Sequence, residues 1–220
     1  SSDVCSSDLI VQLSANASVD VVQDFMVLNM NTTRDGPDAG AVQSQLKAAL
    51  EVALNEARKA TIPGQLEVKT GQFSLSPRYG RDTRITGWQG TVELVMEGRD
   101  FEKISSTAGK IQTLTVSGVS FSLSRELRSR VQTETQAQAI ANFKTQADSI
   151  AKGFGFSGYS LREVSVSAND YGQAFRPRMI AMEGRAAMVD APVPVEAGKS
   201  TVQVTVSGSV QAARGLFASI

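Results

Sequence analysis

Apolar residues recur along this chain with two different periods, which predict strands and helices in alternation. Residues 10–33 favour two strands with a break near 15–18, because apolar and polar positions alternate on both sides of that stretch. After a turn, apolar residues at a spacing of three and four predict an amphipathic helix that Asp38 caps and Pro63-Gly64 ends.

Two later strand segments change phase at a glycine. In residues 66–77 the apolar positions are even before Gly71 and odd after it, and in residues 114–123 the same change occurs at Gly118. One extra residue in each strand, a β-bulge, would keep a single face buried across the change. We therefore predict β-bulges at Gly71 and Gly118.

The elements up to residue 125 predict one unit. A strand at 85–98 precedes a short helix that Asp100 caps and Gly109 ends, so residues 19–124 have the order β-α-β-β-α-β. That order predicts a ferredoxin-like arrangement, in which two helices pack on one face of an antiparallel sheet. We expect a unit at 10–125 that also includes the N-terminal strand.

A second unit follows at 126–212. Its pattern predicts a long helix and two strands, α-β-β, with a loop at 169–198 that contains three prolines and has no apolar period. The whole chain is therefore expected to be an α+β protein. The tail at 213–220 departs from the pattern, and the sequence does not say whether it is native.

The first nine residues fit no element. They hold the only cysteine, Cys5, and lack the basic start and apolar stretch of a secretory signal. Their back-translation matches a common sequencing adapter read in frame, so we expect residues 1–9 to be a cloning or assembly scar. The natural N-terminus, with or without a signal peptide, would then be missing from this chain.

Composition excludes several classes of function. Lys plus Arg and Asp plus Glu balance at 22 each, which argues against a general nucleic-acid binder, and no apolar run reaches the length of a membrane span. The chain has no histidine, which removes the usual general base and the commonest metal ligand. We expect a protein without catalytic residues, cofactor or metal.

Three tempting motifs have simpler explanations. The stretch Gly153–Gly158 matches G-x-G-x-x-G, but it lies between a helix and a strand, so Gly153 is expected to cap the helix instead of binding a nucleotide. Residues 197–201 lack the first glycine of a phosphate-binding loop. Glu93 and Glu97 share the polar face of an alternating strand, where carboxylates usually serve only for solvation.

Two sets of residues are candidates for binding. Arg78, Tyr79, Arg81 and Arg84 form a charged hairpin that could hold an acidic partner, although hairpin tips are often charged. The long loop carries apolar residues that either fold back on the core or pack on a neighbouring subunit. These candidates for self-association are Phe175, Met179, Ile180, Met182 and Met188.

An ordered series of sequence features resembles the SIMPL-domain family (DUF541), over about residues 13–211. The features are "NEARKA" in the first helix, "FSLSPRYG", "ITGWQGTVELVM", "RDFEKISSTAG", "VSFSLS" before the long helix, and "VPVEAG" before the last strand. Trp88 stands where the family usually has Tyr or Phe, and Ala197 where a proline often precedes the glycine.

The resemblance implies a non-enzymatic protein of the periplasm or outer envelope. Bacterial members of the family are typically exported; some are linked to oxidative-stress defence, some are surface immunogens, and one type forms a large ring- or channel-like oligomer. On this basis we expect a homo-oligomer or an envelope protein partner. A small-molecule or peptide-binding module is the alternative function.

Overall fold

The computed structural model describes residues 9–171 and 196–213, and it shows an α+β protein. Within these residues there are three helices and two antiparallel sheets. The chain divides into two compact units. In the described residues, one unit comprises 23–122 and 196–198, and the other comprises 9–22, 123–171 and 199–213.

The first of these, the ferredoxin-like unit, has the predicted order β-α-β-β-α-β. Its elements are β2 (Phe25–Gly36), α1 (Ala39–Lys59), β3 (Leu66–Tyr79), β4 (Ile85–Gly98), α2 (Phe101–Lys110) and β5 (Thr115–Ser122). The sheet order is β3-β4-β2-β5, and every neighbouring pair is antiparallel. Each β-α-β half therefore has a strand of the other half between its own two strands, which is the ferredoxin-like topology.

Both predicted bulges are confirmed. In β3, Thr70 pairs with Leu94 and Phe73 with Val92, so Gly71 and Gln72 together lie opposite a single residue. In β5, consecutive residues of β2 pair with Gly118 and Val116, which leaves an extra residue between them. Each bulge restores the phase of the strand.

A side chain in the preceding turn caps the N-terminus of each helix of this unit, as the sequence predicts. Asp38 accepts a hydrogen bond from the Ala41 N–H at 2.8 Å, and Asp100 accepts one from the Lys103 N–H at 3.0 Å. The predicted end of the second helix at Gly109 is wrong by one residue, because α2 continues through Lys110.

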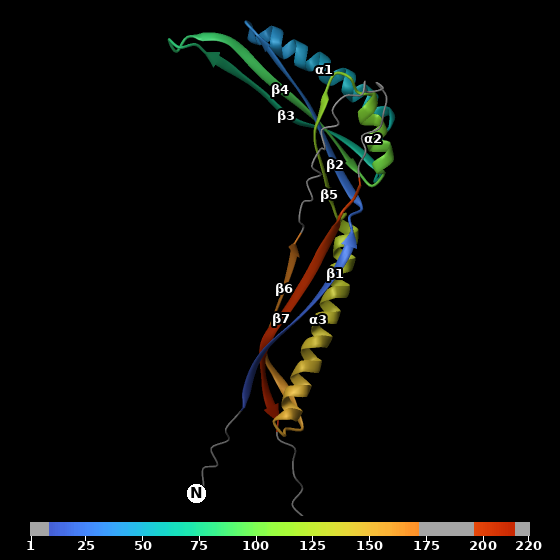
Figure 1. Cartoon of the computed structure of the whole chain (residues 1–220), viewed down its shortest axis with the longest axis vertical. Helices are drawn as coiled ribbons and strands as arrows, with labels where there is room; N and C mark the ends of the chain where they lie inside the picture. Colours follow the sequence, from blue (N-terminus) through green and yellow to red (C-terminus); the bar gives the residue numbers. More distant parts are fainter. Residues whose placement is uncertain (1–8, 172–195, 214–220) are drawn as a thin grey trace, which may run out of the picture. The chain divides into compact units, whose positions relative to one another are not determined.

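Helices α1 and α2 cover one face of the four-stranded sheet (Figure 1). Large apolar side chains fill the layer between them, and each is essentially inaccessible to water: Met26, Leu28, Met30, Leu46, Leu66, Leu94, Met96 and Ile104. The opposite face of this sheet carries mostly polar residues.

The second unit, which we call the three-stranded unit, combines both ends of the described chain. Its elements are β1 (Ile10–Val22), α3 (Arg125–Gly153), β6 (Gly158–Tyr171) and β7 (Lys199–Ala213). The sheet order is β1-β7-β6, with both pairs antiparallel, so β7 is central and β6 is an edge strand (Figure 1). The long helix α3 packs on one face of this sheet.

The expected strand break near 15–18 is wrong. β1 continues without interruption to Val22, and the break lies at Gln23-Asp24. Ala15 and Ala17 do not interrupt the strand; their small side chains leave room for α3, whose Ala139 and Phe143 pack in the same cluster. The N-terminal strand pairs with β7 and not with the ferredoxin-like sheet.

The glycine that ends α3 is Gly155, two residues beyond the predicted Gly153. Gly153 is the last helical residue, whereas Gly155 has φ +79°, a conformation that favours glycine. The Gly155 N–H donates to the Lys152 carbonyl and the Phe156 N–H to the Ala151 carbonyl, both at 2.9 Å. These two bonds form a Schellman motif, and β6 follows directly, so no helix N-terminus follows this glycine stretch.

Candidate functional site

The β3–β4 hairpin brings the four predicted residues Arg78, Tyr79, Arg81 and Arg84 together at one end of the four-stranded sheet. Arg78 and Tyr79 end β3, and Arg81 and Arg84 lie in the loop before Ile85 begins β4. Pro77 lies in β3, which is possible because β3 is an edge strand.

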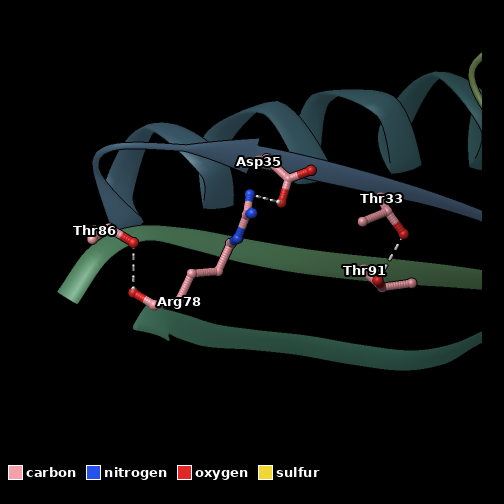
Figure 2. Close-up of polar contacts among 5 residues, drawn as sticks. All are labelled: Thr33, Asp35, Arg78, Thr86 and Thr91. Atoms are coloured by element: carbon pink, nitrogen blue, oxygen red, sulfur yellow. Dashed lines mark hydrogen bonds and ion pairs between the residues drawn. The ribbon is translucent and has the colours of Figure 1, made fainter. Parts of the chain in front are cut away.

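Arg78 reaches across β4 to a carboxylate on β2. Its guanidinium lies 3.5 Å from Asp35 Oδ1, and Thr86 donates a hydrogen bond to the Arg78 carbonyl at 3.2 Å (Figure 2). The β4 residue opposite Arg78 is Gly87, which has no side chain to obstruct this path. Because both charged side chains are about half exposed, the ion pair fixes orientation more than it adds stability.

A second polar contact lies on the same face of the sheet, further from the loop. Thr33 on β2 and Thr91 on β4 are register partners, and their hydroxyl oxygens are 2.9 Å apart (Figure 2). Cross-strand hydroxyl pairs of this kind tie neighbouring strands together. In addition to the backbone pairing of β4 with β2, side chains thus link the hairpin to β2 at two points along its length.

The loop of the hairpin is closed by backbone bonds and contains one unfavourable backbone conformation. The Gly80 N–H donates to the Arg84 carbonyl at 2.8 Å, and the Thr83 N–H donates to the Gly80 carbonyl at 3.1 Å. Thr83 has φ +58°, the only positive φ at a non-glycine residue among those described. A β-branched residue in that region costs free energy, and such outliers concentrate at functional positions.

The tip of the hairpin combines exposed apolar and cationic side chains. Tyr79 and Ile85 are register partners and are 65% and 53% exposed. Arg84 lies 3.8 Å from Asp82, whereas Arg81 has no ion pair within the described part of the chain. Tyrosine and arginine are enriched among the residues that dominate binding energy at protein interfaces.

Ion pairs elsewhere in this unit stabilise charged groups at its surface. The Glu97 carboxylate accepts a hydrogen bond from Lys69 and attracts its charge, and both effects raise the pKa of Lys69. Lys59 donates to Glu56 and lowers the pKa of that carboxyl group. Glu93, on the same strand face as Glu97, accepts a hydrogen bond from the Gln72 N–H at 3.3 Å and so supports the bulge at Gly71.

The other predicted set of binding residues cannot be placed. Phe175, Met179, Ile180, Met182 and Met188 lie outside the described residues. Their role in self-association stays a prediction.

A polar groove lies on the three-stranded sheet, on the face away from α3. The sequence did not predict it. It has a volume of about 480 Å³ and is lined by residues of all three strands. Two rows cross the sheet: Ser14, Ser207 and Ser165 in one, and Gln12, Ser209 and Glu163 in the other. The polar half of each alternating strand was visible in the sequence, but the order of the strands was not.

Two kinds of feature are absent from the described residues. Among residues 9–171 and 196–213, no three acidic, cysteine or histidine side chains gather closely enough to hold a metal ion. None of the three helices there is both long and apolar enough to cross a membrane.

Comparison with known protein families matches residues 11–210 to SIMPL, described as a protein of unknown function (DUF541). A search of curated proteins finds no match. The match extends from the first strand to the last and so includes both sheets and all three helices. The chain therefore belongs to the SIMPL (DUF541) family.

Proposed function

We propose that this protein is a non-enzymatic component of the cell envelope that acts through protein–protein interaction or self-assembly. The observation that carries the proposal is the tip of the β3–β4 hairpin, where Tyr79 and Ile85 are exposed side by side between arginines. When a partner covers two apolar side chains, the free energy falls by roughly 25 cal/mol per Å² of apolar area removed from water.

The build of the hairpin supports this role. Thr86, Asp35 and the loop hydrogen bonds hold the tip in one conformation before any partner arrives. A preorganised surface loses less conformational entropy on binding than a flexible one. Arg81 is available for an acidic group of the partner, because no acidic side chain of the described residues pairs with it.

The compartment and the absence of enzymatic activity are part of the same proposal. Family membership supports a location in the periplasm or outer envelope and a link to oxidative-stress defence. The lack of histidine in the whole chain supports a role that does not depend on acid–base catalysis.

Photo-crosslinking in cells tests the hairpin. A photoreactive phenylalanine analogue at Tyr79 should give a discrete adduct, and Arg81→Ala should weaken it. The matched control is the same analogue at Phe154, which is 68% exposed in the other unit. Equal labelling at both positions, or no adduct at Tyr79, would refute a binding role for the tip.

The polar groove favours a second candidate function, the binding of a small polar molecule or short peptide. Its observation is the two rows of Ser, Gln and Glu side chains across β1, β7 and β6, with the Ser14 and Ser207 hydroxyl oxygens 3.2 Å apart. Calorimetric titration with polar metabolites and short peptides tests it. Binding that Ser207→Val abolishes would support this function over the first.

A further inference from the structure

The four strand edges of the two sheets differ in how well they are protected. An open edge presents unpaired N–H and C=O groups to other chains, and proteins usually block it with charges, proline, bulges or covering side chains. β3 has Pro77, Lys69 and the bulge at Gly71. β5 has only eight residues and its own bulge. Both edges of the ferredoxin-like sheet therefore resist pairing with a further strand.

In the described part of the three-stranded unit, α3 protects one edge and leaves the other, where β6 has a bulge at Arg162 and pairs regularly with β7 from Glu163 onward. Asn142 of α3 donates a hydrogen bond to the Asn16 carbonyl of β1 at 3.0 Å. The side chains of β1 and β7 that face α3 form its apolar cluster, to which β6 contributes only Tyr159. The helix therefore covers β1 and β7 and stops short of most of β6.

The uncovered part of β6 is apolar on the helix side of the sheet. Leu161, Val164 and Val166 pair with Val210, Gly208 and Val206 of β7, so they point to the same side as the buried valines. They are nevertheless 44–53% exposed. Three aliphatic side chains in a row on an open edge strand form a surface that a further strand and helix could cover.

The sequence of β6 suits pairing with its own copy. Residues 164–169, Val-Ser-Val-Ser-Ala-Asn, carry no charge and extend about 20 Å in a strand. In a two-fold antiparallel pair centred on Ser165 or Val166, Val164 lies opposite Val166 or Ala168. Glu163 lies opposite Ser167 or Asn169 and never opposite its own copy, so no like charges meet.

We propose that two copies of this protein join edge to edge through β6. The product is one continuous antiparallel sheet of six strands, β1-β7-β6-β6-β7-β1, with the two α3 helices on the same face and the stripes of Leu161, Val164 and Val166 between them. This inference rests on the self-assembly part of the proposed function and does not involve the hairpin tip.

Sedimentation equilibrium of Val166→Lys tests the pairing. The wild-type protein should show a concentration-dependent dimer step, and Val166→Lys should weaken it at least about tenfold, because it places two lysines near the two-fold axis. Val19→Lys on β1 is the matched control, since Val19 is also an exposed valine on the opposite edge of the same sheet, and it should leave the step unchanged.

A cysteine scan provides a second measurement, which does not depend on weakening the association. With Cys5 replaced by serine, single cysteines at 163–168 should form disulfide-linked dimers under mild oxidation, most rapidly at the residue nearest the axis, because a disulfide requires Cα atoms within about 7 Å. A cysteine at Ser18 on β1 should not.

The outcomes separate this inference from the proposed function. A protein that is monomeric at all concentrations overturns both the β6 dimer and self-assembly, but leaves the hairpin tip untouched. A protein that assembles, resists Val166→Lys, and becomes smaller when residues 173–190 are replaced by a Gly/Ser linker overturns the β6 dimer alone and assigns assembly to that loop. Assembly that Val19→Lys disrupts assigns it to β1.

Discussion

Two helices cover one sheet of this protein and one helix covers the other. The width of a helix explains why one strand of the second sheet is left uncovered. A helix with its side chains is about 10 Å across and neighbouring strands are about 4.8 Å apart, so one helix covers roughly two strands. Two helices cover the four strands of the ferredoxin-like sheet, and Val92, Leu94 and Met96 of β4 are wholly buried. One helix covers two of the three strands in the other unit, and β6 is left over.

The largest expected effects come from truncating one buried anchor in each unit. Leu46→Ala in α1 should destabilise the ferredoxin-like unit by about 2–5 kcal/mol, and Phe143→Ala in α3 should destabilise the three-stranded unit by about 3–5 kcal/mol, because each leaves a cavity. Fluorescence of Trp88, the only tryptophan, reports on the first unit alone, whereas circular dichroism also reports on α3.

The comparison between the units fails if the two variants behave alike. Leu46→Ala should shift the fluorescence transition in urea, and Phe143→Ala should shift the dichroism signal with little change in fluorescence. Coincident shifts of both signals in both variants would mean that the two cores unfold as one cooperative body.

A glycine substitution sharpens the comparison at the end of β4. Gly98 has φ +154°, and a Cβ there would run into the Gln65 carbonyl oxygen, which belongs to the backbone and cannot rotate away. Gly98→Ala should therefore cost at least about 1–3 kcal/mol in the free energy of unfolding. Gly118→Ala is the control, since nothing lies within 4 Å of its added Cβ, and its effect in the same urea titration should be small. Equal losses for both would count against the backbone clash.

Removal of a helix cap should cost about 1 kcal/mol in either unit. Asp38 begins α1 by accepting from the Ala41 N–H, and Ser124 begins α3 by accepting from the Leu127 N–H at 3.3 Å. Asp38→Ala should lower the midpoint of the Trp88 transition in thermal melts, and Ser124→Ala that of the dichroism transition. A reversed assignment would show that each cap supports the other unit.

The smallest expected effect concerns pH. Glu97 raises the pKa of Lys69, so the stabilisation from this pair is fully present below the ordinary lysine pKa and is lost as the pH rises through the raised one. Glu97→Gln should lower the pKa of Lys69 toward its ordinary value, as measured by NMR of the lysine side chain. Glu67→Gln, which removes a weaker attraction, should lower it less.

Sequence patterns predicted the ferredoxin-like unit well because its signals are local. A change of apolar phase at Gly71 and Gly118 requires an extra residue wherever the strand pairs, so the bulges could be predicted without knowing the partner strand. Asp38 and Asp100 cap helices through bonds to residues three positions ahead.

The remaining features depend on residues that are distant in sequence. The small residues at 15–18 are compatible with a break or with a helix above the strand, and only the position of α3 decides between them. The polar groove and the open edge of β6 require the order β1-β7-β6, which no local pattern contains. The arginines of the hairpin were recognisable, but the link between Arg78 and Asp35 depends on the pairing of β4 with β2.

The pairing of β1 with β7 determines the order in which the two units fold during synthesis. β1 precedes the whole ferredoxin-like sheet in the chain, and its partner begins at Lys199, so the three-stranded unit encloses the other in sequence. At synthesis rates of about 5–20 residues per second, β1 waits roughly 10–40 s for its partner. The ferredoxin-like sheet can form during that interval, while closing the long loop between β1 and β7 delays the other unit. The sheet that carries the open edge is therefore the last part of the protein to mature.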